Sequence, residues 1–206
     1  MSDSNFSPPF IHSTAIVEDG VQLGSDVKIW HFAHIRSGAV LDEGVSIGKD
    51  VFIDEGVHIY RGTRIQNGVS IYRGVQLSPW CFIGPHVIFT NDLSPRAGNR
   101  SWQVIPTSVH TGASIGAGAV ICCGITLEAF SLVGAGAIVA NSVPAFHLVT
   151  GVPAKITKKV CACGQSLLDV SVLTSNLIRE CCQKNMHPEV YNLARETLQS
   201  IISQDV

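Results

Sequence analysis

Polar residues suited to binding or catalysis gather in the first half of the chain, at positions related by steps of eighteen residues. Lys49 lies eighteen residues after His31, and Asn67 lies eighteen residues after Lys49. Asp54 likewise lies eighteen residues after Arg36. An imidazole can move a proton near neutral pH, and an amide can orient a reacting group. If the chain folds with a period of eighteen, these side chains form columns on one surface.

A six-residue repeat supplies that period. An aliphatic residue or Phe occupies every sixth position from Ile11 to Phe89, and the rhythm resumes in a new register from Val109 to Val139. A period of six fits neither a helix nor a long strand, but it fits short strands joined by tight turns. Three such strands close one coil of eighteen residues. We therefore predict an all-β solenoid, a parallel β-helix in which twenty hexads give a little under seven coils.

One segment interrupts the repeat, IFTNDLSPRAGNRSWQVIPTSV at residues 88–109. We predict that residues 90–108 form an extended loop, which overhangs the polar columns or reaches a neighbouring subunit. Asn91 stands where the chain leaves the coil, and Arg96 lies on the loop. The Arg96 guanidinium could hold a phosphate or carboxylate through two hydrogen bonds, or it could pin its own loop. The sequence leaves both roles open.

The repeat also divides the chain. We predict an N-terminal extension at 1–10, the β-helix domain at 11–157 and a mostly helical tail at 158–206. Apolar residues at helical spacing, with Pro188 in the first turn, predict a helix within 187–204. Residues 171–184 are a second candidate helix.

The tail also carries cysteines whose spacing raises the question of a zinc site. Cys161 and Cys163 are followed by the adjacent pair Cys181 and Cys182, and then by His187. This spacing departs from paired zinc knuckles, and adjacent cysteines are poor tetrahedral ligands. We therefore expect free, partly buried thiols and no metal requirement.

The composition restricts the class of protein. Hydrophobic residues make up 46% of the chain, and the mean hydropathy is +0.28, but no run of eighteen apolar residues is present. The segment MSDSNFSPPF lacks the basic start and apolar centre of a signal peptide, so we expect a cytoplasmic protein. A net charge of −2 without a block of Lys or Arg argues against nucleic acid as a partner.

Two sets of motifs resemble a known family. The repeat and its closing segment SLVGAGAIVANSVPAFHLVTGVPAKI resemble the hexapeptide-repeat acyltransferases. The segments KIWHFAHIRSG, VFIDEGVHI, IQNGVSIY and FTNDLSPRA resemble a narrower group, the nucleotide-sugar 3-amino N-acetyltransferases. That group includes enzymes acting on UDP-2-acetamido-3-amino-2,3-dideoxyglucuronate in the synthesis of bacterial surface polysaccharides such as the lipopolysaccharide O-antigen. Over residues 11–157 the resemblance implies a left-handed β-helix, acetyl-CoA as co-substrate and a homotrimer with active sites between subunits.

The resemblance also implies roles for individual residues. Asn91 matches the Asn of the FTN motif and would orient the acceptor amine. His31 and His34 match the histidines of the family's WHFxH motif, and we expect sugar contacts first and general-base catalysis second. In this group the departing CoA thiolate takes the amine proton. We predict Asn91, His34 and His31 as catalytic residues. The predicted substrate-binding set is His31, His34, Arg36, Gln66, Asn67, Tyr72, Asn91 and Arg96.

Coenzyme A is expected along the later coils. There the sequence is rich in Gly and Ala, and we expect these small residues on the outer faces, where an extended ligand can lie against the backbone. The resemblance implies that the backbone near Gly112, Ala113, Ala119 and Ala137 faces the pantetheine arm and that the adenosine end lies near Pro153 and Lys155. The predicted cofactor-binding set is Gly112, Ala113, Ala119, Ala137, Pro153 and Lys155.

Other functions stay open at this point. The acceptor could be a dTDP-3-amino-3,6-dideoxyhexose, or the enzyme could be an O-acetyltransferase. A different class on this fold is the γ-type carbonic anhydrase, a zinc protein with three histidine ligands across the trimer interface. The central coils here lack the close histidine pair of that class. A non-catalytic β-helix that organises partners is a third possibility.

Overall fold

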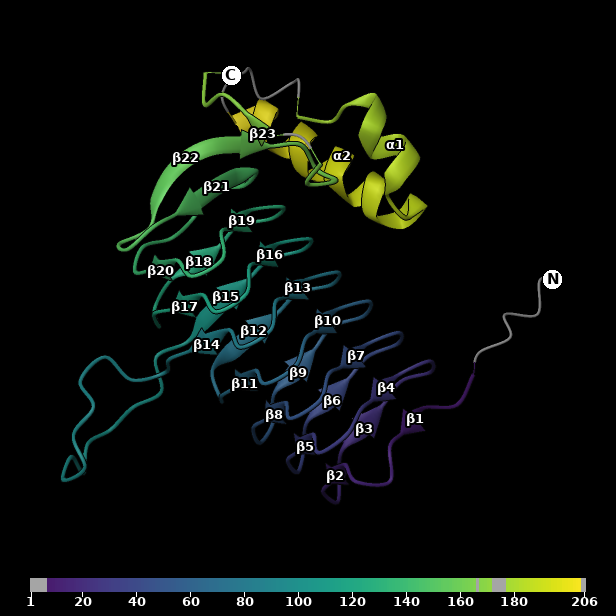
Figure 1. The fold of residues 1–206 in the computed structure, drawn as a ribbon, viewed down its shortest axis with the longest axis vertical. Coiled ribbons are helices and arrows are strands. Elements are labelled where there is room, and N and C mark those ends of the chain that lie inside the picture. Colours follow the sequence, from purple (N-terminus) through teal and green to yellow (C-terminus); the bar gives the residue numbers. More distant parts are fainter. Residues whose placement is uncertain (1–6, 166, 172–176, 205–206) are drawn as a thin grey trace.

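The computed structural model describes residues 7–165, 167–171 and 177–204 (Figure 1). A parallel β-helix occupies most of this length, and its short strands fall into three sheets, A, B and C. The parallel strands of sheet A are β1 (Phe10–Ile11), β4 (Lys28–Ile29), β7 (Ser46–Ile47), β10 (Arg64–Ile65), β13 (Phe82–Ile83), β16 (Ser114–Ile115), β19 (Leu132–Val133) and β21 (His147–Thr150).

The other two sheets complete each coil. Sheet B holds β2 (Ile16–Val17), β5 (His34–Ile35), β8 (Phe52–Ile53), β11 (Ser70–Ile71), β14 (Ile88–Phe89), β17 (Val120–Ile121) and β20 (Ile138–Val139). Sheet C holds β3 (Gln22–Leu23), β6 (Val40–Leu41), β9 (His58–Ile59), β12 (Val75–Leu77), β15 (Thr107–Val109) and β18 (Thr126–Leu127).

The pairing register confirms the predicted period. Ile35 pairs with Ile53, and Ile53 pairs with Ile71, each eighteen residues further on. Their side chains are fully buried and form part of a continuous core along the axis. Burying one such side chain contributes roughly 1.5–3 kcal/mol, so the aliphatic column is the main source of stability. The predicted parallel solenoid is confirmed.

The solenoid is taller than the hexad count suggests, because sheet A holds eight parallel strands. The additional coil comes from residues 140–150. These residues lack the six-residue pattern, but they still pair with the preceding coil. Val149 pairs with Val133, and Val143 forms a bridge with Leu127.

The tail begins with strands and ends with helices. β22 (Lys155–Val160) folds back antiparallel on β21, and β23 (Leu167–Leu168) pairs with β22. The helices α1 (Glu180–Asn185) and α2 (Pro188–Gln204) follow. The predicted helix over 187–204 is confirmed, whereas α1 takes up only the end of 171–184, of which 172–176 lie outside the described residues.

Helix α2 packs on the β-helix through its apolar face. Ala194 and Leu198 belong to a second core with Phe130 and Phe146, whose rings stack 5.3 Å apart. At the start of α2, Glu189 forms an ion pair with Arg61. The tail therefore lies along the corner at which the chain passes from sheet C to sheet A.

Three corners join the sheets, and we name each by the sheets it connects. The A–B corner consists of turns at residues 12–15, 30–33, 48–51, 66–69, 84–87, 116–119 and 134–137. The C–A corner consists of turns at 24–27, 42–45, 60–63, 78–81, 110–113 and 128–131. The B–C corner consists of turns at 18–21, 36–39, 54–57, 72–74 and 122–125, together with the long loop at 90–106. Figure 1 shows this loop projecting away from the coils between β14 and β15.

Candidate functional site

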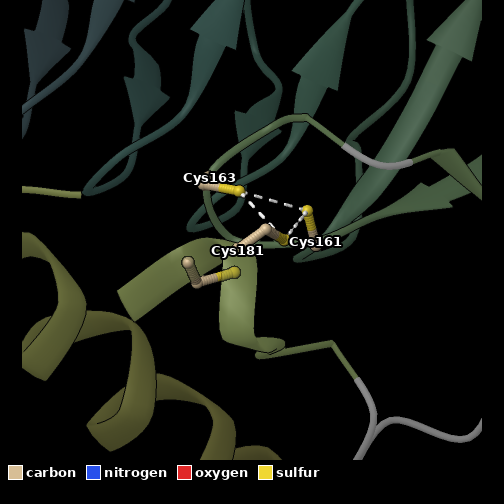
Figure 2. A group of neighbouring side chains, drawn as sticks. Cys161, Cys163 and Cys181 are labelled. Atoms are coloured by element: carbon tan, nitrogen blue, oxygen red, sulfur yellow. Dashed lines mark hydrogen bonds between the residues drawn. The ribbon is translucent and has the colours of Figure 1, made fainter. Parts of the chain in front are cut away.

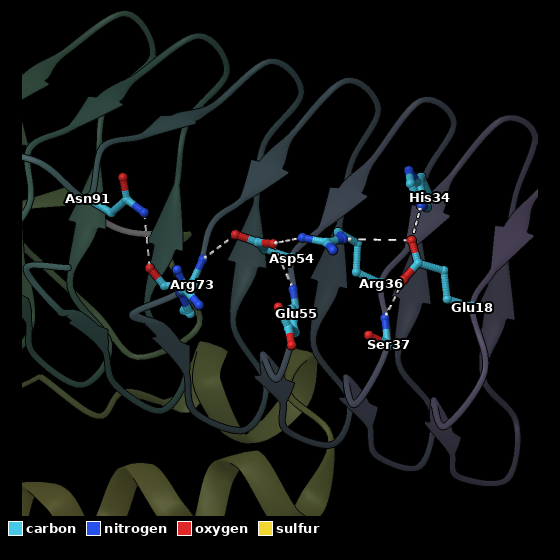
Figure 3. Close-up of polar contacts among 8 residues, drawn as sticks. All are labelled: Glu18, His34, Arg36, Ser37, Asp54, Glu55, Arg73 and Asn91. Carbon is cyan, nitrogen blue, oxygen red and sulfur yellow. Dashed lines mark hydrogen bonds and ion pairs between the residues drawn. The ribbon is translucent and has the colours of Figure 1, made fainter. Parts of the chain in front are cut away.

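A chain of polar contacts runs up the B–C corner (Figure 3). Glu18 lies at its lower end, where Oε1 is 2.7 Å from His34 Nε2 and Oε2 accepts from the Ser37 N–H at 2.9 Å. Arg36 bridges upward, because its Nη1 donates to Asp54 Oδ1 at 3.1 Å. The sequence-based site set omitted Glu18, although it stands eighteen residues before Arg36 and so belongs to the same column.

The chain of contacts continues from Asp54 to the base of the long loop. The Arg73 N–H donates to Asp54 Oδ2 at 3.2 Å. Asn91 Nδ2 in turn donates to the Arg73 carbonyl oxygen at 3.3 Å. We call the whole set, Glu18, His34, Arg36, Ser37, Asp54, Glu55, Arg73 and Asn91, the corner network.

Two carboxylates of the corner network, Glu18 and Asp54, have pKa values below their usual range. The Ser37 N–H and then the His34 side chain lower the pKa of Glu18 below its usual 4.5. Burial raises the pKa of Asp54, but hydrogen bonds from Glu55, Arg73 and Arg36 outweigh that effect, and the net shift is downward from 3.8. The Asp54 side chain raises the pKa of Arg36. Arg36, a predicted substrate contact, is therefore already neutralised by acids of its own chain.

Asn91 is fixed at the point where the loop leaves and returns. Its backbone carbonyl accepts from the Ile105 N–H at 2.9 Å, while its Nδ2 is bound to Arg73. Its Oδ1 accepts no hydrogen bond from any residue that the structure describes. On the returning limb, the Trp102 ring lies 5.9 Å from the Arg73 guanidinium carbon, within reach of a cation–π contact. Asn91 thus presents one free acceptor beside an anchored loop.

The three predicted catalytic residues are not brought together in one chain. His31 lies on the A–B corner, where its ring stacks on His12 with centroids 3.5 Å apart, whereas Asn91 lies on the B–C corner. His34 points outward from sheet B between these corners. It is three strands below Asn91, a rise of about 14 Å at ~4.8 Å per strand. A single amine cannot contact both. The expectation of one continuous patch from His31 to the loop is therefore wrong.

The other predicted sugar contacts divide in the same way. Gln66 and Asn67 lie on the A–B corner, and Asn67 Oδ1 caps the Lys49 N–H at 2.9 Å. Tyr72 lies on the B–C corner, 38% exposed, with its ring 6.0 Å from that of Phe52.

Arg96 lies on the exposed part of the loop. Its Nη1 donates to the carbonyl oxygen of the preceding residue, Pro95, at 2.8 Å, as expected of a residue that pins its own loop.

The structure corrects the expected outer position of several cofactor-binding residues. The side chains of Ala113, Ala119 and Ala137 are fully buried, because the residue two before each aliphatic position points inward. Their carbonyl oxygens accept from neighbouring coils, so their backbone is also engaged. Gly112 lies on the C–A corner, where a Cβ atom would come within 2.4 Å of the Phe130 ring. Gly112 and Ala113 therefore do not share a groove with the other predicted cofactor-binding residues, which are Ala119, Ala137, Pro153 and Lys155.

Small exposed residues do form a strip, one position away from those predicted. Ala117 and Gly118 are exposed on the A–B corner, and Ala135 and Gly136 lie directly above them. The turn at 151–154 adds the next level, because the Ala154 N–H donates to the Ile138 carbonyl oxygen at 2.8 Å. Its exposed Pro153 follows a cis peptide bond, and the exposed Lys155 begins β22. We call residues 116–118, 134–136 and 151–154 the small-residue strip.

Sheet B carries an apolar row between the strip and the corner network. Five of the seven strands of sheet B place an apolar residue outward, and Ile16, Ile88 and Ile138 are 59%, 52% and 36% exposed, while β5 and β11 place His34 and Ser70 there. The corresponding positions of sheet C include Gln22, His58, Gln76, Ser108 and Thr126. Exposed apolar rows of this kind mark interaction surfaces. We call the outward residues Ile16, Phe52, Ile88, Val120 and Ile138 the sheet B stripe.

Outside these regions, most reactive side chains have structural partners. His58 pairs with Asp42, and His110 pairs with Glu128, each at 2.9 Å. Burial raises the pKa of Cys81 to about 12, so this thiol is not a nucleophile.

The tail cysteines lie close together, although their spacing in the sequence departs from paired zinc knuckles. Cys161, Cys163, Cys181 and Cys182 come together, with all four sulfurs within 4.8 Å of one another. They are the only group of three or more His, Cys, Asp or Glu with metal-binding spacing among the residues that the structure describes. His187 is not among them and stacks on Trp80, with ring centroids 5.0 Å apart.

Comparison with known proteins gives partial similarities. No protein-family model matches the chain. A dTDP-3-amino-3,6-dideoxy-alpha-D-galactopyranose 3-N-acetyltransferase from Aneurinibacillus thermoaerophilus is 43% identical over 61 residues, or 30% of this chain and 32% of that protein. A serine acetyltransferase from Buchnera aphidicola subsp. Schizaphis graminum is 38% identical over 85 residues, or 38% of this chain and 33% of that protein. The matches thus span about a third of the length of these relatives.

A solved structure agrees with the fold. Galactoside acetyltransferase in complex with coenzyme A superposes with a TM-score of 0.51 and 22% identity, covering 59% of this chain and 64% of that one. Among the described residues, no helix is both long and apolar enough to cross a membrane. The chain thus has the six-residue repeat and the parallel β-helix of a hexapeptide-repeat protein, and over about a third of its length its sequence is similar to two acetyltransferases.

Proposed function

We propose that this protein is an acetyl-CoA-dependent N-acetyltransferase that acts on the 3-amino group of a nucleotide-linked amino sugar. The observation that carries this proposal is the 43% identity to an enzyme that acetylates the 3-amino group of a dTDP-linked sugar. The anchored Asn91 with its free Oδ1 supports it, because an amide oxygen can accept from the acceptor amine and aim its lone pair.

The proposed active site needs two subunits. The small-residue strip lies on the A–B corner and Asn91 on the B–C corner, so the two flank sheet B on opposite sides in one chain. A thioester on the strip would be separated from an amine at Asn91 by the width of that sheet. The exposed sheet B stripe between them supports a homotrimer in which the strip of one subunit faces the corner network of the next.

Within such a site, the chemistry is a direct acetyl transfer. The neutral amine attacks the thioester carbon from about 3–3.5 Å, the carbon–sulfur bond breaks, and the CoA thiolate leaves. The leaving thiolate takes the amine proton, so no protein base is required. Asn91 orients the amine and cannot itself act as a base. His34, about 14 Å lower, is assigned to a more distant part of the nucleotide sugar.

For the acceptor, we propose UDP-2-acetamido-3-amino-2,3-dideoxyglucuronate. Its C6 carboxylate needs a cation, and Arg73 is exposed beside Asn91 and Trp102. Arg36 is unsuited to that role, because Asp54 and Glu18 already neutralise it. A dTDP-3-amino-3,6-dideoxyhexose, the kind of substrate named for the similar enzyme, is the alternative acceptor, and it lacks this carboxylate.

The test is a thiol-release assay with acetyl-CoA and a panel of acceptors. The panel holds the UDP-linked uronate, its analogue with a neutral C6 group, a dTDP-3-amino-3,6-dideoxyhexose and a sugar with a hydroxyl in place of the amine. We expect the highest kcat/KM for the uronate and a preference of about tenfold or more over its neutral analogue. A preference for the dTDP sugar would reject the uronate, and turnover of the hydroxyl sugar alone would reject N-acetyl transfer.

A further inference from the structure

The four cysteines of the tail come from two separate segments. Cys161 and Cys163 follow β22, while Cys181 lies in the first turn of α1 (Figure 2). Cys182 is the next residue of the same turn. Cys161 and Cys182 are buried, and the other two are half-buried. The two pairs are separated by about twenty residues of chain, and none of the four cysteines belongs to the corner network, the small-residue strip or the sheet B stripe.

The sulfur–sulfur distances distinguish between two explanations. Cys161 Sγ lies 3.4 Å from Cys163 Sγ and 3.8 Å from Cys181 Sγ, and the last two are 3.6 Å apart. A disulfide requires about 2.05 Å. Four thiolates around a tetrahedral Zn²⁺, each at about 2.3 Å, lie about 3.8 Å from one another. The cluster therefore has the dimensions of a tetrahedral sulfur shell and not of a cystine.

The local backbone supports this shell. Gly164 has a φ of +73°, and its N–H donates to the Cys161 carbonyl oxygen at 2.8 Å, which closes a tight turn. This turn carries Cys161 and Cys163 on the same side. The Arg179 N–H points at Cys182 Sγ at 3.5 Å, a contact of the kind that orients a metal-bound thiolate. Because the turn packs against the start of α1, even the adjacent Cys181 and Cys182 both reach the cluster.

We propose that Cys161, Cys163, Cys181 and Cys182 bind one Zn²⁺ as a closed structural site. Four protein ligands leave no position for substrate, so the metal has a structural role and not a catalytic one. It joins the end of β22 to α1, and through α1 it holds α2. The start of α2 contacts the β-helix, where His187 stacks on Trp80 and Glu189 pairs with Arg61. The metal thus fixes the tail to the coils.

Metal content of the full chain tests this proposal. The protein is purified without an affinity tag under reducing conditions, and its zinc and iron are measured by inductively coupled plasma mass spectrometry. We expect about one zinc per chain, lost in Cys163→Ser and in Cys182→Ser. The matched control is Cys122→Ser, from the other adjacent cysteine pair, which keeps its zinc. Iron in place of zinc, a Cys161–Cys163 disulfide, or an unmetallated protein after refilling with Zn²⁺ would each overturn the proposal.

A second measurement on the wild-type chain does not depend on the folding of variants. Alkylation followed by mass spectrometry counts the accessible thiols before and after a chelator. We expect the four tail cysteines to react only after chelation, and hydrogen exchange to rise in residues 177–204 while the coils stay protected. Equal reactivity before and after chelation would contradict the site. Neither readout involves acetyl transfer, so a negative result here leaves the proposed enzymatic function standing.

Discussion

Asn91 combines two roles at the level of a single side chain. Its Nδ2 closes the corner network on Arg73, and its Oδ1 is left for a ligand. An aspartate would keep an acceptor at this position but lose the donor to Arg73. The alanine and aspartate variants therefore separate loss of the ligand contact from loss of the anchor.

We expect Asn91→Ala to lower kcat by about 10²-fold, because the amine loses its orienting group. The dissociation constant of acetyl-CoA, measured by isothermal titration calorimetry, should stay within about twofold of wild type, since the strip lies elsewhere. Unchanged turnover would remove Asn91 from the proposed site. Asn99→Ala on the exposed loop is the matched control, and it should behave as wild type.

Glu18 and Asp54 give the corner network a pH dependence of known sign. Both pKa values are depressed in the folded chain, so the stability they contribute is present above pH ~4.5 and is lost as the pH falls through the lowered values. We expect Asp54→Asn to reduce the fall in Tm between pH 5 and about pH 3, as measured by circular dichroism. Asp19→Asn, an exposed neighbour, is the control and should retain the wild-type dependence. If the Tm of Asp54→Asn fell as far as that of wild type over this pH range, the corner network would not be the source of the acid sensitivity.

At the scale of secondary-structure elements, the three sheets of the coil differ in what they present to solvent. All three bury their aliphatic residues equally, because the inward positions repeat every six residues. Their outward rows distinguish them: five of the seven outward residues of sheet B are apolar, whereas sheet A alternates exposed Phe10 and Phe82 with Lys28 and Arg64. A solenoid exposes such a row along its whole length, so a single charge on it acts on an extended interface.

Replacing Ile88 by glutamate should disrupt the proposed trimer and leave each chain folded. Ile88 is 52% exposed in the single chain, so the change removes no core contact. Light scattering coupled to size exclusion should shift from a trimer to a monomer at micromolar concentration, with an unchanged circular dichroism spectrum. Gln76→Glu, which changes an outward residue of strand β12 in sheet C, is the matched control and should stay trimeric. A wild-type chain that is itself monomeric would reject the assembly.

At the scale of the whole molecule, the separation of the strip from Asn91 makes a prediction about mixed assemblies. Asn91→Ala damages the corner network side of the site, and Ala135→Glu blocks the strip side. The turn position of Ala135 is occupied by Lys49 in an earlier coil, and the equivalent position of the B–C corner is occupied by Glu55, so a long side chain is compatible with this turn.

When the two variants are co-expressed, their mixed trimers should recover about a quarter or more of wild-type activity, although each variant alone is nearly inactive. Recovery follows because one subunit supplies an intact strip and the next an intact Asn91. The activity of differently tagged, co-purified assemblies checks this. No recovery in assemblies of verified mixed composition would place both halves of the site in one chain.

The sequence by itself determined the coil, the buried column, the place of the long loop and the helix at 188–204. A period of six sets which residues face inward, and a period of eighteen sets which lie above one another, so no long-range information is needed. Only the tertiary structure decided which corner each predicted residue occupies. Ile83 pairs with Ile115, thirty-two residues further on instead of eighteen, because the long loop lies between them. A spacing of eighteen residues therefore does not identify vertical neighbours across the loop. Gly112 and Ala113 lie on the C–A corner, whereas Ala119 and Ala137 lie on the A–B corner. The cysteine cluster also lies outside the repeat, where the path of the tail and its packing on the C–A corner bring distant segments together.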